Sequence, residues 1–234
     1  MRKEIKKPYL IVFFAAILML MSTIPGGMAN GNGIPAQLRL EAIPGTYVES
    51  SEDAWLNESY VTTNTSFDLN ITYNQSQKGN ISYLYLLVAV NMTPSGNVTV
   101  NVSGNTVGPY DGVIKNNKAL VNDTEPDYEY PGHGIYKNGS STCFEVVNIT
   151  SLIPGGTLVG DETMTVHIDI NPINPVKVHF DAVGADSNKA PIAFVPPSHD
   201  VTYDYVPEFT TIAIPVAAVL GLLFFFNHRK KRRE

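Results

Sequence analysis

Three stretches of the chain alternate strictly between apolar and polar residues, and this period of two is the feature that most restricts the fold. The alternation runs through residues 66–73, 98–102 and 164–170. A period of two is typical of a β-strand with one buried and one solvated face, whereas a helix repeats every 3.6 residues. Apart from one apolar segment near each end, no stretch shows a convincing helical period. These patterns predict a chain that folds mainly into strands.

Five further strands follow from composition and turn residues. Residues 81–92 are apolar almost throughout, which predicts a central strand covered on both faces. Shorter strands are expected at residues 37–43, 144–149, 176–180 and 193–195. Turns rich in Gly, Pro, Asn and Asp separate these segments. We therefore predict a mostly β domain, an antiparallel β-sandwich of immunoglobulin-like or jelly-roll-like type.

The N-terminal segment has the three parts of a signal peptide. Arg2, Lys3, Lys6 and Lys7 form a positive region that precedes an apolar stretch over residues 9–21, and small residues end at Ala29. This order predicts a signal peptide over residues 1–29 with cleavage after Ala29. An uncleaved N-terminal anchor is the alternative.

The C-terminal segment predicts a membrane helix. Residues 210–226 carry no charge and would span about 25 Å as a helix, close to the hydrocarbon thickness of a bilayer. Residues 227–234 follow as a basic tail, which the positive-inside rule holds on the cytoplasmic side. Residues 30–206 are then expected to form an ectodomain outside the cell.

Charge and cysteine content limit the range of functions and stabilising cross-links open to that ectodomain. Of 16 Lys and Arg residues, four precede the first apolar segment and five follow the second, leaving seven; of 22 Asp and Glu residues, nineteen remain. A net charge near −12 repels nucleic acid and anionic lipid, so nucleic-acid partners are excluded. Cys143 is the only cysteine, so the chain forms no internal disulfide.

N-glycosylation sequons are far more frequent than chance predicts. There are eleven in the ectodomain, where about three would be expected from composition. Eight of them fall between Asn57 and Asn101, and none follows Asn148. On the alternating strands the sequon asparagines occupy the polar face, where a glycan is tolerated. The candidate acceptors are Asn57, Asn64, Asn70, Asn74, Asn80, Asn91, Asn97, Asn101, Asn122, Asn138 and Asn148.

A long segment without strand rhythm, residues 108–141, offers a candidate binding surface. It holds four tyrosines together with glycine and polar residues, a composition that suits an adaptable surface. A loop packed over an open end of the sandwich is the alternative. Asp111-Gly112 before Val113-Ile114 could also mark a hairpin.

Catalytic motifs are weak. Ser198-His199-Asp200 contains the residue types of a catalytic triad, but neighbouring side chains in an extended chain point apart, and a turn after Pro196-Pro197 is favoured. His133, His167, His179 and His199 lack zinc-site spacing, and His167 and His179 are expected to be exposed. We expect no enzymatic activity.

Calcium is the one metal hypothesis that the sequence supports. Four aspartates fall in turn-rich sequence near the end of the ectodomain, and calcium prefers carboxylate and carbonyl oxygens from such turns. These residues are Asp181, Asp186, Asp200 and Asp204. No DxDxDG loop is present, and solvated acidic turns are the alternative.

The last 28 residues resemble a known sorting signal. Pro207-Glu208-Phe209 is followed directly by the uncharged segment and then by the basic cluster, in the order and spacing of the PEF-CTERM signal of archaeal surface proteins. That resemblance implies an archaeosortase-type transpeptidase partner, which would cut near these residues and transfer the ectodomain to a membrane lipid. Residues 178–184 and 196–200 also resemble the endings of "choice-of-anchor" surface domains.

Taken with the signal peptide and sequons, the tail predicts an exported, N-glycosylated archaeal surface protein on the outer face of the plasma membrane. Its expected role is structural, or interaction with envelope glycoproteins or glycans. The alternative is an adhesin or carbohydrate-binding module that uses residues 108–141, with calcium as a cofactor. The predicted divisions are 1–29, 30–206 and 207–234.

Overall fold

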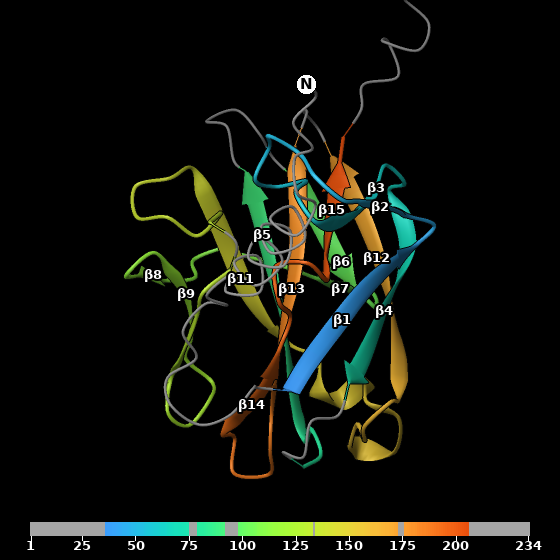
Figure 1. Ribbon diagram of the computed structural model, residues 1–234, viewed down its shortest axis with the longest axis vertical. Coiled ribbons are helices and arrows are strands. Elements are labelled where there is room, and N and C mark those ends of the chain that lie inside the picture. The colour runs from blue at the N-terminus through green and yellow to red at the C-terminus, as the bar shows by residue number, and fades with distance from the viewer. Residues whose placement is uncertain (1–35, 75–78, 92–97, 133, 173–175, 206–234) are drawn as a thin grey trace, which may run out of the picture. The chain divides into compact units, whose positions relative to one another are not determined.

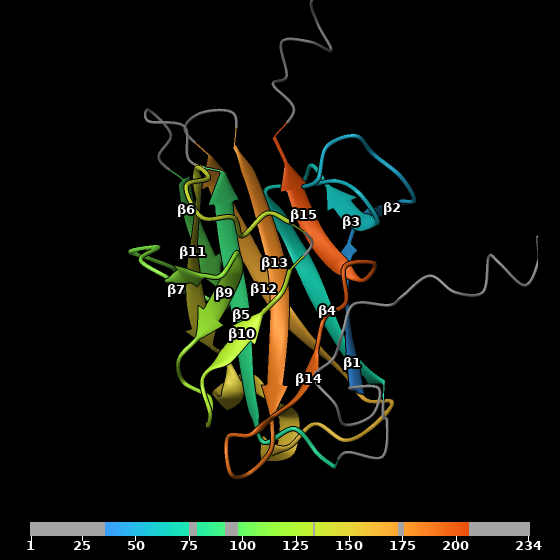
Figure 2. The ribbon, with the colours of Figure 1, turned by 60° about the vertical axis from the view of Figure 1, so that its left-hand side comes forward.

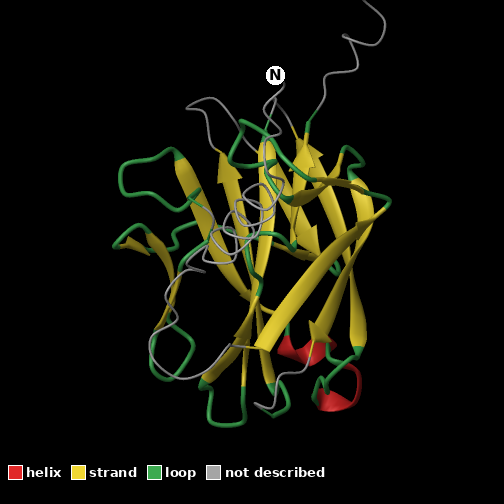
Figure 3. Cartoon of the chain, viewed as in Figure 1, coloured by secondary structure: helices red, strands yellow, loops and turns green. Residues whose placement is uncertain are grey.

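The computed structural model describes residues 36–74, 79–91, 98–132, 134–172 and 176–205 (Figure 1). Strands dominate these residues, and the helical segments among them are two single 3-10 turns, η1 (Thr150–Leu152) and η2 (Pro154–Gly156) (Figure 3). Within the described ranges, no helix is long and apolar enough to cross a membrane. The predicted signal peptide and the predicted membrane helix lie outside them.

All eight strands predicted from the sequence are present. They are β1 (Ala36–Ile43), β4 (Ser66–Asn74), β5 (Tyr83–Asn91), β6 (Val98–Val102), β11 (Thr142–Asn148), β12 (Thr163–Pro172), β13 (Lys177–Ala185) and β14 (Pro191–Phe194). The mostly β class is therefore confirmed.

Seven strands were not predicted, because runs of two to five residues are too short to display a period. They are β2 (Thr46–Val48), β3 (Ser59–Thr62), β7 (Asn105–Thr106), β8 (Ile114–Lys115), β9 (Lys118–Val121), β10 (Tyr128–Tyr130) and β15 (Asp200–Asp204).

The long strands fall into two groups joined at one edge (Figure 1). One group runs β1-β4-β12-β6-β7, and the other centres on β13, which pairs with β5 along one edge and with β15 and β14 along the other. Apolar side chains from both groups form a single core cluster. The expectation of purely antiparallel pairing is wrong, because β1 pairs with β14 and β15 pairs with β3 in parallel.

The alternating strands behave as their sequence predicts. In β4, Phe67, Leu69, Ile71 and Tyr73 are buried, whereas the residues between them are exposed or half-buried. β12 shows the same pattern over its whole length. These two central strands therefore present one face to the core and a polar face to solvent.

β5 and β13 are instead buried on both faces. Their outer side chains, Tyr85, Leu87 and Val183 among them, form a second apolar cluster with residues of the segment 119–136. Residues 114–130 contain the separate three-stranded sheet β10-β9-β8, which lies in front of β5 and β13 in Figure 2. The second apolar cluster fills the space between the two sheets.

The expectation of a tyrosine-rich loop over residues 108–141 is therefore wrong. Tyr130 and Tyr136 are fully buried, and the segment covers a sheet face rather than an open end. A hairpin is present, but its turn is Asn116-Asn117, both in the left-handed region with φ of 53° and 58°. Gly112 has a different role: a Cβ there would lie 2.6 Å from the Phe144 ring.

Candidate functional site

Three side chains of the metal-ligand type meet in the interior where β13 pairs with β15. His179 and Asp181 lie two residues apart on β13 and so point to the same face, and Asp200 begins the neighbouring strand. All three residues are completely buried. Their ligand atoms lie within 4.8 Å of one another, and we call these residues the buried triad.

Two tyrosines cover the buried triad from the segment that contains β10. The Tyr130 hydroxyl donates to Asp181 Oδ1 at 2.7 Å and also lies 2.8 Å from the Val195 carbonyl oxygen. The Tyr136 hydroxyl donates to Asp181 Oδ2 at 2.8 Å. Burial, and then the nearby Asp181 carboxylate, raise the pKa of both tyrosines well above the ordinary value. Both side chains therefore remain neutral phenols that can donate.

The hydrogen bonds around His179 assign its tautomer. Thr202 Oγ1 donates its one proton to the Trp55 carbonyl oxygen, and it lies 2.7 Å from His179 Nδ1. His179 Nδ1 therefore carries a proton and donates to Thr202. His179 Nε2 faces Asp181 Oδ2 at 3.3 Å. The edge-on Trp55 ring, 6.0 Å from the imidazole between centroids, closes this side.

Among the described residues, the four candidate calcium aspartates do not form one group. The fold brings Asp181 and Asp200 together but places the other two elsewhere. Asp186 accepts hydrogen bonds from the backbone of Asn188 and Ala190 in the turn after β13. Asp204 ends β15 half-buried, where burial raises its pKa. His179, which was expected to be exposed, takes their place beside Asp181.

The Ser198-His199-Asp200 sequence divides between a turn and a strand. Ser198 Oγ lies 2.7 Å from His199 Nδ1, and the His199 amide donates to the Pro196 carbonyl in the predicted turn. Asp200 is buried with the triad instead of lying in solvent. Burial, together with the positive charge of Arg39, lowers the pKa of His199.

The remaining histidines differ from His179. His167 is exposed on β12, as predicted, between Asp68 and Asp169. His133 lies outside the described residues. Cys143 is half-buried near the start of β11 and packs against the main core.

Ten of the eleven sequon asparagines fall within the described ranges, and none of these ten is buried. Asn97 lies outside those ranges. Asn70 Oδ1 accepts from Thr165, and Asn101 Oδ1 accepts from Thr106. Because glycosylation occurs at Nδ2, these hydrogen bonds to Oδ1 leave the reactive nitrogen available.

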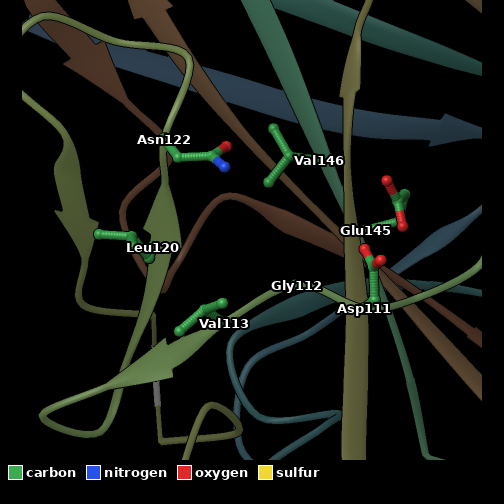
Figure 4. Close-up of a pocket in the computed structure, with 7 residues that line it drawn as sticks. All are labelled: Asp111, Gly112, Val113, Leu120, Asn122, Glu145 and Val146. Carbon is green, nitrogen blue, oxygen red and sulfur yellow. The ribbon is translucent and has the colours of Figure 1, made fainter.

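A small hollow lies between β9 and β11 (Figure 4). Asp111 and Glu145 lie on one side of it, and Leu120 and Asn122 on the other. Its volume is about 130 Å³, well below the roughly 300 Å³ of a typical small-molecule site. This hollow is too small to be the binding site of an oligosaccharide.

The sorting residues Pro207, Glu208 and Phe209 lie outside the described residues, and the comparison with known families concerns their sequence. Residues 206–230 match the PEF-CTERM archaeal protein sorting domain. The chain carries a PEF-CTERM sorting domain. This domain indicates a membrane-anchored protein of the archaeal cell surface and implies processing by an archaeosortase. No curated protein matches the chain.

Proposed function

We propose that the chain is an exported, N-glycosylated surface protein whose β domain has a structural or interaction role on the outer face of the membrane. The observation that carries this proposal is the PEF-CTERM match over residues 206–230. A simple anchor requires only an apolar helix and a basic stop, whereas this tail also has Pro-Glu-Phe immediately before the helix. The role includes no enzymatic activity and no nucleic-acid partner.

Pro207 explains how the tail would be presented to a transpeptidase. Proline has no N–H and a fixed φ, so it resists outward extension of the membrane helix and favours an extended conformation in the residue before it. An extended, charged tripeptide at the membrane surface would fit the cleft of a membrane-embedded cysteine transpeptidase. Its thiolate would attack a peptide carbonyl near Pro207-Glu208-Phe209, and the tail would leave with a new amino terminus. A nucleophilic group on a lipid would then take over the acyl group and release the thiolate.

Glycosylation is supported by where the sequon asparagines lie. Asn70 is half-buried on the polar face of β4, and Asn101 on that of β6. Other acceptors, including Asn64, Asn122 and Asn148, are exposed. Sugar on these residues would shield the domain from other envelope components. Glycopeptide mapping should find Asn70, Asn97 and Asn101 occupied; three unmodified asparagines would remove glycan attachment on the strand faces from the proposal.

No observation carries an adhesin role for residues 108–141. Tyr130 and Tyr136, which would have supplied large contact residues, are buried against Asp181. Tyr110 and Tyr128 are half-buried. The segment therefore serves as a cover of the sheet.

The processing step is tested by replacing Pro207, Glu208 and Phe209 together with alanine in the native host. The wild-type protein should lose residues 210–234, and the variant should accumulate in an unprocessed form that keeps its basic tail. Glu125→Ala, a change at an exposed ectodomain residue, is the control and should be processed normally. Equal processing of the alanine variant would show that the tripeptide has no role.

A further inference from the structure

We infer that the buried triad of His179, Asp181 and Asp200 binds one divalent transition-metal cation of the zinc class, and that this ion is structural. The inference concerns the ectodomain alone and is independent of tail processing. All three residues are buried, and none has a solvent-exposed surface. Groups of this kind are placed in a protein interior at a high cost unless they are compensated.

The spacing within the triad fits a metal better than a direct ion pair. His179 Nε2 and Asp181 Oδ2 are 3.3 Å apart. A charge-assisted N–H···O hydrogen bond is usually about 2.7–2.9 Å long. Two ligands of a tetrahedral zinc ion, with bonds of about 2.0–2.1 Å, lie about 3.3–3.4 Å apart. A ligand oxygen of Asp200 lies within 4.8 Å of both.

The tautomer of His179 supplies the second argument. Because Thr202 gives its proton to the Trp55 carbonyl, His179 uses Nδ1 as a donor toward Thr202. The nitrogen that faces Asp181 is then Nε2, which has a lone pair in the neutral ring. Two lone pairs that face each other require a cation between them, which is either a proton or a metal ion. A ligand histidine held by a hydrogen bond at its other nitrogen is the usual arrangement in metal sites.

The contacts of Asp181 fit the same arrangement. Its two oxygens accept from Tyr136 and Tyr130, so the carboxylate is oriented by groups that are themselves buried and neutral. Such outer hydrogen bonds hold a ligand carboxylate in place. A divalent ion would also balance the two carboxylates of Asp181 and Asp200, which gives a neutral interior site.

The donor set selects the type of ion. Calcium requires six to eight oxygen ligands, whereas this site offers one imidazole nitrogen and two carboxylates. Zinc accepts nitrogen and oxygen ligands in a four-coordinate site, and the buried triad supplies three of the four positions. A metal that links β13 to β15 would also supply the cross-link that a chain with a single cysteine cannot make as an internal disulfide.

The test is metal analysis of the full-length protein, purified in detergent without chelator and dialysed against zinc buffered at a low free concentration. Wild-type protein should contain about one zinc ion per chain. His179→Gln and Asp200→Asn should lose it, whereas His167→Gln should retain it. His167 is a matched control because it also lies between two aspartates, but on an exposed face.

A second measurement avoids variants that fail to fold. Adding Zn²⁺ at about 100 times its dissociation constant to chelator-treated wild-type protein should raise Tm by about 5–10 °C. Co²⁺ in the same site should give the visible absorption typical of tetrahedral coordination. Metal-free protein whose Tm does not respond to Zn²⁺ would overturn the inference and leave a proton between His179 and Asp181. Binding of Ca²⁺ in preference to Zn²⁺ would also overturn it.

Discussion

β12 and β13 carry the same local motif, a histidine, an apolar residue and an aspartate, in opposite surroundings. His167-Ile168-Asp169 on β12 has its two polar side chains about half exposed, whereas His179-Phe180-Asp181 on β13 is completely buried. Both apolar residues point into the main core. The difference comes from residues 119–136 and Trp55, which cover β13, whereas the polar face of β12 is open to solvent. Burial at these positions is therefore decided by a distant segment and not by the local sequence.

Removal of the aspartate should destabilise the protein strongly in the buried motif and weakly in the exposed one. Asp181→Ala would remove the acceptor of the Tyr136 hydroxyl, one of the two acceptors near the Tyr130 hydroxyl and the carboxylate beside His179. It should lower the free energy of unfolding by about 3–5 kcal/mol. Asp169→Ala, at a solvated position, should change it by about 0.5 kcal/mol or less. Urea unfolding of both variants measures the difference. Equal losses would contradict the distinction between the two strands.

The packing of residues 119–136 on β13 can be weakened without a change of charge. Tyr136→Phe removes one hydrogen bond to a buried carboxylate and should cost about 1.5–3 kcal/mol. Tyr47→Phe, on an exposed side chain, is the control and should be nearly neutral. Thermal unfolding of the pair checks this. A neutral Tyr136→Phe would mean that the hydroxyl does not stabilise the interior of the domain.

Gly132 and Gly139 allow the packing of this segment to be tested through the backbone. Both have positive φ, but a Cβ on Gly132 would lie 2.4 Å from the Tyr136 ring, whereas a Cβ on Gly139 would meet nothing within 4 Å. Gly132→Ala should therefore be less stable than Gly139→Ala by about 1–3 kcal/mol. Chemical denaturation of both variants isolates the contact from the backbone strain. If the two variants were equally stable, the segment would not pack tightly on Tyr136.

The exposed motif on β12 should make a smaller contribution to the free energy of unfolding, and this contribution should depend on pH. The hydrogen bond from His167 to Asp68, aided by Asp169, raises the pKa of His167 above 6.5 in the folded state. Protonated His167 therefore stabilises the fold fully at pH values below about 6.5, and this contribution disappears as the pH rises through the folded-state pKa. Because the group is exposed, water and salt screen the contribution.

NMR titration of the His167 ring gives that pKa directly. A midpoint above 6.5 in the wild type, and a lower one in Asp68→Asn, are the expected results. A wild-type midpoint at or below 6.5 would show that the two aspartates do not act on this ring.

The sequence alone predicts those strands whose buried faces follow from their own pattern of apolar and polar residues. β4 and β12 follow a strict alternation, and β5 is continuously apolar, so all three were predicted with the correct faces. β15 was missed because only five residues, three of them polar, follow the Pro196-Pro197 turn.

The buried triad could not be read from the sequence for the same physical reason. Asp200 lies 21 residues after His179, and the tyrosines that cover the site come from 51 and 45 residues before Asp181. These residues meet only because β13 pairs with β15 and because residues 119–136 pack over β13. The tail was predictable because a sorting signal is read as a linear sequence, with no tertiary contacts required.

The most direct test of the surface assignment is the intact mass of the protein isolated from its native membrane. The isolated chain should lack residues 1–29 and 210–234, carry glycans that raise its mass well above that of the polypeptide, and end in an attached lipid. The same sample should yield no peptides that cover Arg229–Arg233. Recovery of those peptides at full stoichiometry, on a chain with the mass of bare polypeptide, would contradict the account.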